Sequence, residues 1–146
     1  MSDTVVIDAS LAAMWVVPEA YSDQALALAD EWAKAPTRLL APCLVLAEVA
    51  NALYRRAARQ EVTLSTAQTA LGVFLQFGIE VREEPGLQAQ AMELAHQLKL
   101  PTVYDCQYLA LAERHQCDLW TGDHQFYNAA NQAFPRVKWI GEYPRS

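Results

Sequence analysis

The sequence predicts an α/β protein built around a parallel β-sheet, and three observations support this fold class. Short β-branched segments alternate with longer helix-forming stretches along the chain, which is typical of parallel sheets flanked by helices. Of the 146 residues, 53% are hydrophobic and 19% are charged, which is enough apolar material to build a core without disulfides. No linker, repeat or low-complexity segment interrupts the pattern, so we expect residues 1–146 to form a single domain.

The first half of the chain is expected to hold two strands and four helices. Residues 4–7 are a β-branched run, and residues 38–41 form a weaker strand pattern. Prolines, a glycine and capping residues delimit the helices. We expect helices at residues 11–17, before Pro18; from Ser22 or Asp23 to Lys34; at 43–60, after Pro42; and from Ser65 to Gly78.

The second half repeats the alternation. Strands are expected at residues 79–82, 118–121 and 137–140, and helices at residues 87–98, 105–115 and 126–131. The helix that follows Ser65 is apolar on nearly every side between residues 67 and 77. A chain of this length cannot easily bury a helix all round, so this helix is expected to contribute to a subunit interface.

Two acidic residues follow predicted strands. Asp8 comes after the strand at 4–7, and Asp123 comes after the strand at 118–121. In open parallel sheets, ligand sites lie at the carboxyl ends of the strands. Ser10 and Thr121 place a hydroxyl group beside each acid. Both acids also precede a helix, so a plain capping role is the alternative interpretation for each.

Two further acids lie on predicted helices. Asp105 begins a helix, where free amide groups favour its charge, and capping is again the alternative. Glu48 lies inside an apolar helix and, if it faces inward, needs a cation or strong hydrogen bonds. It shares a helical face with Asn51, Arg55 and Arg59, so a solvated face is the alternative.

Together, the carboxylates of Asp8, Glu48, Asp105 and Asp123 suggest a metal centre. If they converge, their mutual repulsion raises some pKa values unless cations enter the site. Sets of oxygen ligands suit Mg²⁺ and Mn²⁺ rather than Zn²⁺. Such ions can polarise a phosphate and activate water. The three cysteines and three histidines show no ligand spacing, and a Walker-type glycine loop is absent.

The net charge of −6 argues against binding nucleic acid by bulk charge alone. It does not argue against a metal enzyme, because bound cations change the sign of the local charge. The N-terminal segment lacks the basic and apolar pattern of a signal peptide, and no apolar run is long enough to cross a bilayer. We therefore expect a cytoplasmic protein.

Four segments of the chain, taken in order, resemble the PIN domain, and more closely the VapC-type toxins of bacterial type II toxin–antitoxin pairs. They are Val5-Val-Ile-Asp-Ala-Ser10, Leu46-Ala-Glu-Val-Ala-Asn-Ala-Leu53, Val103-Tyr-Asp-Cys-Gln-Tyr-Leu-Ala-Leu-Ala-Glu113 and Leu119-Trp-Thr-Gly-Asp-His-Gln-Phe126. Each motif alone is short, but their order is specific, and the resemblance spans nearly the whole chain. The chain departs from the family at Cys106, where a small alanine is common.

The resemblance implies a three-layer α/β/α fold with a parallel sheet of about five strands. It implies a Mg²⁺- or Mn²⁺-dependent endoribonuclease in which Asp8, Glu48, Asp105 and Asp123 form the acidic quartet. Ser10 and Thr121 would match the hydroxyls of the site, and Asn51 would neighbour Glu48. It also implies a homodimer and a cognate antitoxin protein. Arg55 and Arg59 are candidate contacts for RNA or antitoxin.

Two other functions remain open at this stage. One is a non-catalytic interaction module on the same scaffold, which the acidic balance and the apolar helix favour. The other is phosphoryl transfer through Asp8. However, Ser10 stands where haloacid-dehalogenase-like phosphatases need a second aspartate, and the acidic pair of receiver domains is missing.

Overall fold

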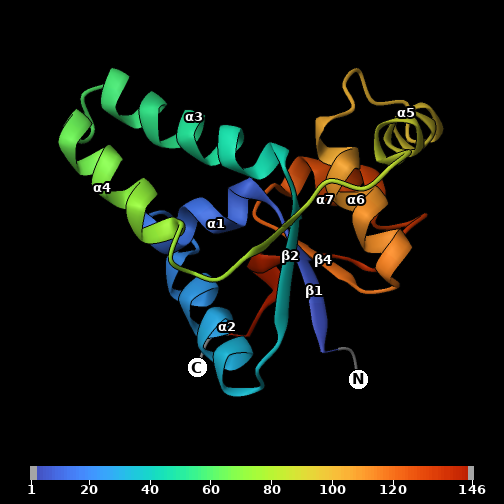
Figure 1. Ribbon diagram of the computed structural model, residues 1–146, viewed down its shortest axis with the longest axis horizontal. Helices are drawn as coiled ribbons and strands as arrows, with labels where there is room; N and C mark the ends of the chain where they lie inside the picture. Colours follow the sequence, from blue (N-terminus) through green and yellow to red (C-terminus); the bar gives the residue numbers. More distant parts are fainter. Residues whose placement is uncertain (1–2, 145–146) are drawn as a thin grey trace.

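The structure is a computed structural model that describes residues 3–144, and it contains a five-stranded parallel sheet (Figure 1). The strand order is β3-β2-β1-β4-β5, and every neighbouring pair is parallel. The strands are β1 (Thr4–Ile7), β2 (Arg38–Pro42), β3 (Glu80–Arg82), β4 (Asp118–Thr121) and β5 (Val137–Trp139). The predicted α/β class and parallel sheet are confirmed. The predicted single domain includes residues 1, 2, 145 and 146, which lie outside the described residues.

Seven α-helices and one short 3₁₀-helix connect the described strands. They are α1 (Ala9–Val16), α2 (Ser22–Lys34), α3 (Leu44–Ala58), α4 (Leu64–Phe74), α5 (Leu87–Gln97), α6 (Tyr104–His115), α7 (His124–Ala130) and η1 (Ile140–Glu142). None of the helices between residues 3 and 144 is long and apolar enough to cross a membrane.

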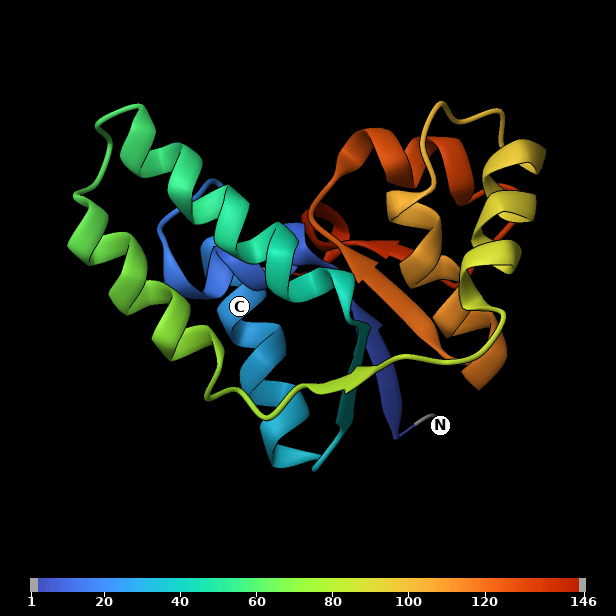
Figure 2. The ribbon, with the colours of Figure 1, turned by 45° about the horizontal axis from the view of Figure 1, so that its top comes forward.

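The helices form layers on the two faces of the sheet. Helix α6 contacts β1, β2 and β4, and α5 packs on the outside of α6. Helices α1 and α2 lie on the opposite side, and α3 and α4 extend from α1 as an arm that projects beyond the sheet (Figures 1 and 2). This confirms the predicted three-layer arrangement.

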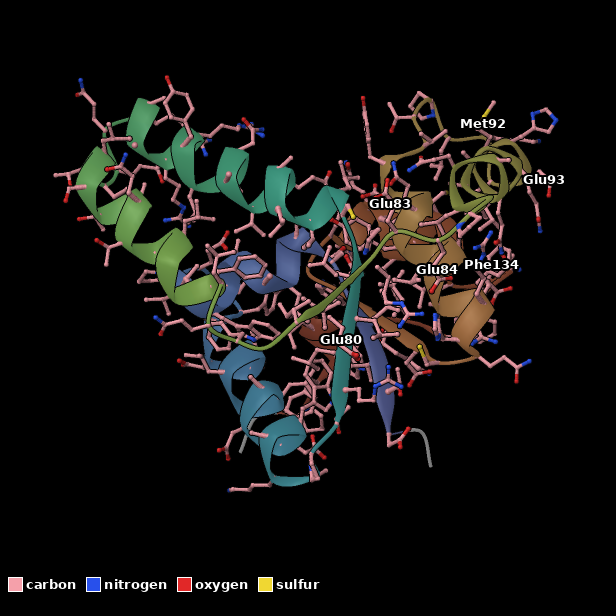
Figure 3. All side chains as sticks on the ribbon, in the orientation of Figure 1. Glu80, Glu83, Glu84, Met92, Glu93 and Phe134 are labelled. Atoms are coloured by element: carbon pink, nitrogen blue, oxygen red, sulfur yellow. The ribbon has the colours of Figure 1, made fainter. Side chains whose placement is uncertain are left out.

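Burial explains why β1 and α6 occupy the centre of the protein. All four residues of β1 are buried, as expected for a strand covered on both faces. In α6, seven consecutive residues from Cys106 to Ala112 are buried. The C-terminal end of α6 is held by Glu84 of the β3–α5 connection, whose Oε2 lies 2.9 Å from His115 Nε2 (Figure 3).

The chain reverses its direction across the sheet between β1 and β4. The connections β1–β2 and β2–β3 run towards one edge, whereas β4–β5 runs towards the other. Crossover helices therefore diverge between the carboxyl ends of β1 and β4, which is the usual position of a ligand-binding crevice. Asp8 and Asp123 follow these two strands.

Some predicted details were wrong. Thr63, not Ser65, caps α4: its hydroxyl accepts a hydrogen bond from Thr66 N at 3.0 Å. Helix α4 ends at Phe74, before Gly78, which adopts a left-handed conformation (φ 72°) in the following loop. Tyr21 precedes α2 without a side-chain cap, while the Ser22 hydroxyl instead accepts from Glu19 N. The first of these errors involves two nearby residues, Thr63 and Ser65, whose hydroxyls have similar capping ability.

Candidate active site

Asp8 is held firmly at the end of β1. Its backbone N–H still donates to Trp120 O of β4 at 3.3 Å, so the residue stays in register with the sheet. Its side chain is 4% exposed, and Oδ1 accepts hydrogen bonds from Ser10 Oγ at 2.6 Å and from Leu11 N at 3.0 Å. Asp8 therefore caps α1 and also lines the site, so the two interpretations of this residue are compatible.

Asp123 occupies the matching position after β4. Its Oδ1 accepts hydrogen bonds from Gln125 N at 2.9 Å and Phe126 N at 3.2 Å, and it caps α7. Its own backbone N–H donates to the buried hydroxyl of Thr121 at 2.9 Å. One of the two oxygens, Oδ1, is thus directed to the helix amides, and the turn is fixed by Thr121.

Ser10 joins the two strand ends. Its hydroxyl donates to Asp8, accepts from Gly122 N at 2.9 Å and lies 3.3 Å from Thr121 Oγ1. Gly122 permits this close approach, because a Cβ there would stand 3.2 Å from the backbone of Ser10 and 2.6 Å from Met14 Cε. This role of Gly122 was not predicted from the sequence.

Glu48 reaches the site from α3 and is held by Tyr108 of α6. The Tyr108 hydroxyl donates a hydrogen bond of 2.5 Å to Glu48 Oε1. Tyr108 is almost fully buried, and burial together with this bond raises its pKa far above its usual range, so the hydroxyl remains a donor. The role of Tyr108 was not predicted from the sequence. Its spacing of three residues from Asp105 places both on one face of α6, and that was the available signal.

Asp105 differs from the other acids because no donor among the described residues forms a hydrogen bond with its carboxylate. It lies in the first turn of α6 and is partly buried. Desolvation by burial and the charges of Asp8, Asp123 and Glu48 raise its pKa to about 7. Burial, opposed by the hydrogen bonds from Ser10, Thr121 and Leu11, raises the pKa of Asp8 to about 6.

These residues line one cleft of about 310 Å³, which we call the acidic cleft. Its lining consists of Asp8, Ala9, Ser10, Glu48, Asn51, Ala52, Arg55, Asp105 and Asp123. All four predicted acids therefore meet, with Ser10 and Asn51. Thr121 lies behind the cleft and supports Asp123.

The two predicted arginines differ in position. Arg55 lines the acidic cleft and is exposed, and its guanidinium makes no ion pair or hydrogen bond with any residue between 3 and 144. Arg59 is absent from the lining and instead forms an ion pair with Glu61 at 3.0 Å. Among the described residues, Arg55 is thus the cation available beside the four acids.

The donor set fits a hard divalent cation. It consists of carboxylates, and the raised pKa values of Asp8 and Asp105 show that burial and mutual repulsion disfavour their charged forms. Within residues 3–144, no three metal-ligating side chains already converge on a common ion position. The site is an open cleft rather than a closed cage, which suits an ion such as Mg²⁺ that keeps several water ligands.

Fold and cleft together define a three-layer α/β protein with an acidic crevice at the point where its crossovers diverge. The family model of the PIN domain matches residues 5–132. The chain belongs to the PIN domain family, and the predicted resemblance is confirmed.

Solved structures agree with this fold. The structure of PAE2754 from Pyrobaculum aerophilum is 24% identical, with a TM-score of 0.71 over 94% of this chain and 84% of that chain. The structure of VapC20 from Mycobacterium tuberculosis, a sarcin-ricin loop cleaving toxin, is 22% identical, with a TM-score of 0.65 over 86% of this chain and 95% of that chain. No curated protein matches the chain.

Proposed function

We propose that this protein is a metal-dependent endoribonuclease that acts as one domain over residues 1–146. The observation that carries the proposal is Asp105: a carboxylate without a hydrogen-bond donor, in a cleft with three other acids, with its pKa raised to about 7. A fold that kept this arrangement without a cation would lose stability at neutral pH. Membership of the PIN domain family, whose members are generally nucleases, supports the same conclusion.

The proposed roles follow from the contacts of each side chain. Asp8, Glu48, Asp105 and Asp123 would hold Mg²⁺ or Mn²⁺, which when bound supplies charge neutralisation and an activated water for phosphodiester hydrolysis. Ser10 and Thr121 orient the strand-end acids, and Tyr108 orients Glu48. Asn51 and Arg55 stand at the cleft, where Arg55 can pair with a phosphate of the substrate.

We further propose that the nuclease is the toxin of a type II toxin–antitoxin pair. The similarity in fold to VapC20, together with the ordered motifs of the sequence, supports this assignment. A cognate antitoxin protein would then be a partner, and the site of action would be the cytoplasm. The exposed side chains of Leu64, Val73 and Leu75 on and beside α4 support a homodimer interface at the arm.

The alternatives are less well supported. A phosphoryl-transfer role through Asp8 is disfavoured because Ser10, whose hydroxyl donates to Asp8 Oδ1 at 2.6 Å, stands where haloacid-dehalogenase-like phosphatases need a second aspartate. Acetyl phosphate labelling would test that role. A non-catalytic interaction module is favoured by the exposed apolar residues of the arm, but it leaves the raised pKa values of Asp8 and Asp105 without a purpose.

The deciding experiment is Mn²⁺-dependent cleavage of a mixed cellular RNA pool by the wild type and by Asp8→Asn. We expect discrete fragments from the wild type and none from the variant. The same proteins are then melted with and without Mn²⁺, because a ligand that binds the folded state raises its Tm. Absence of both cleavage and metal stabilisation in the wild type would overturn the proposal in favour of the interaction module.

A further inference from the structure

Four aromatic side chains contact one another in a group that includes His124, the residue after Asp123, and we call them the ring cluster: Tyr21, His124, Tyr127 and Trp139. The His124 ring centroid lies 4.1 Å from that of Trp139, with 34° between the planes. Tyr127 lies 6.2 Å from His124 and nearly parallel to it, at 16°. Tyr21 packs edge-on against Trp139 at 5.4 Å. The proposed chemistry of the acidic cleft uses none of these four rings.

The ring cluster lies at the same edge of the sheet as the acids. Trp139 is the last residue of β5 and pairs in register with Thr121 of β4. His124 follows Asp123 directly and is the first residue of α7. A nucleic-acid strand whose phosphate enters the acidic cleft would therefore bring its neighbouring nucleotide towards these rings.

Residues of η1 hold two of the rings, Trp139 and Tyr127, in place. A Cβ at Gly141 would stand 2.3 Å from the Trp139 ring, so the indole lies directly on the glycine backbone. The Tyr127 hydroxyl donates to Glu142 Oε1 at 3.0 Å. His124 is exposed, whereas Trp139 and Tyr127 are only partly exposed. The cluster therefore presents one accessible ring on a fixed aromatic base.

An acidic RNA-binding protein needs a source of affinity other than charge. The chain carries a net charge of −6, and Arg55 is the cation among the described residues that line the acidic cleft. Stacking of bases on aromatic side chains depends little on net charge and is a general means of holding unpaired nucleotides.

We propose that His124, packed at a tilt against Trp139, is a platform for the nucleobase next to the phosphate that enters the acidic cleft. This inference rests on the proposed nuclease function and adds to it a residue that positions the nucleotide beside the cleavage site. His124 is then a positioning residue and not a residue that reacts.

Measurements of RNA binding test the platform role of His124 separately from RNA cleavage. The probes are a fluorescent CACACACAC ribonucleotide, the same strand paired with its complement, and an abasic sugar–phosphate strand of equal length. Dissociation constants are measured by anisotropy in EDTA and again in Ca²⁺. The proteins are the wild type, His124→Ala, His124→Phe, which keeps a ring without an ionisable nitrogen, and His96→Ala, an exposed histidine on α5.

We expect the wild type to bind the single strand about tenfold more tightly than the abasic strand, as stacking on one ring would give. The preference over the abasic and duplex strands should disappear in His124→Ala and persist in His124→Phe and His96→Ala. An unchanged preference in His124→Ala, or no binding by the wild type, would overturn the platform. A change in oligomeric state in His124→Ala with the preference intact would assign this surface to a protein partner and also overturn it.

Failure of the His124 platform and failure of the proposed nuclease function give different results. RNA cleavage by the wild type together with an unchanged preference in His124→Ala would refute the platform and leave the nuclease standing. A preference that depends on His124 in a protein that neither cleaves RNA nor gains stability from Mn²⁺ would support the platform and refute the nuclease.

Discussion

The hydroxyl of Tyr108 donates a 2.5 Å hydrogen bond to the carboxylate of Glu48, which links α6 to α3 beside the acidic cleft. This bond fixes the one acid of the cleft that belongs to the projecting arm. Replacement of Tyr108 by phenylalanine removes the bond while keeping the ring in the core. We expect the affinity for Mn²⁺ to fall about 10–100-fold, as is typical when a group that orients a metal ligand is lost. Stability should fall by only about 1 kcal/mol.

Isothermal titration with Mn²⁺ and thermal melting measure the two effects of Tyr108→Phe separately. Tyr143→Phe is the matched control, because its hydroxyl donates to Glu31 at 2.7 Å, away from the acidic cleft. Equal loss of Mn²⁺ affinity in both variants would contradict an orienting role for Tyr108.

Asp105→Asn should abolish cleavage and yet stabilise the metal-free protein. The substitution removes one of four mutually repelling charges, and no hydrogen bond of the Asp105 carboxylate is lost. At pH 7.5 without metal we expect a gain in stability on the order of 1 kcal/mol, because relief of repulsion is partly screened by solvent. Melting curves and an RNA cleavage assay measure both properties. Asp118→Asn, at the opposite end of β4, is the control, and retained cleavage in Asp105→Asn would refute the assignment.

Deprotonation of Asp8 and Asp105 should destabilise the metal-free protein as the pH rises from 5 to 7, above the range in which Glu80 and Glu84, whose pKa values are lowered, lose their protons. The pKa values of Asp8 and Asp105 are raised from 3.8 to about 6 and about 7 in the folded state. In this range the folded state binds more protons than the unfolded state, so the free energy of unfolding decreases with increasing pH. Mn²⁺ should reverse the trend at pH 7.5 and have little effect at pH 4.5. Thermal melting across this pH range, with and without Mn²⁺, measures this pH dependence of stability. A Tm that rises with pH in EDTA would contradict the raised pKa values of Asp8 and Asp105.

Arg55→Ala should weaken RNA binding more than Arg59→Ala. The Arg55 guanidinium lines the acidic cleft, whereas that of Arg59 pairs with Glu61. Loss of one phosphate contact should reduce the slope of log affinity against log salt by about one. Binding titrations from low to moderate salt measure this slope. Equal slopes for both variants would place the substrate elsewhere on the surface.

Gly122→Ala should destabilise the fold, because the new methyl group would meet Met14 and the backbone of Ser10. We expect a loss of about 1–3 kcal/mol, the usual cost of overpacking, together with displacement of Asp123. Gly72→Ala is the matched control: nothing lies within 4 Å of a Cβ at that position of α4, so this variant should be slightly more stable. Chemical denaturation of both variants measures the difference, and equal effects would contradict the close approach at Gly122.

The sequence predicted the fold class and the four acids because both depend on local patterns. Strand endings indicated Asp8 and Asp123 directly, since parallel strands share one carboxyl edge. Spacing alone did not show whether the Glu48 side chain faces solvent or the site. A helical face that carries a polar residue at every turn is compatible with either position. The structure shows that this face divides: Glu48 and Arg55 line the cleft, while Arg59 turns to Glu61.

Long-range contacts account for what the sequence did not show. Tyr108 is one of many apolar residues in α6, and only its contact with Glu48, 60 residues earlier, distinguishes it from the core. The proposed role of His124, in α7, likewise depends on its contact with Trp139 of β5. The choice of Thr63 over Ser65 as a cap was undetermined because both residues have suitable hydroxyls.

The junction between β1 and β4 also has a consequence during protein synthesis. Ser10 and Thr121 lie 3.3 Å apart but 111 positions apart in the chain. A ribosome that extends the chain at about 5–20 residues per second makes Asp8 seconds before Asp123 exists. Until β4 has left the ribosome and docked beside β1, the nascent polypeptide lacks one wall of its cleft. Under the proposed nuclease function, the four acids could therefore come together only when translation of the chain is nearly complete.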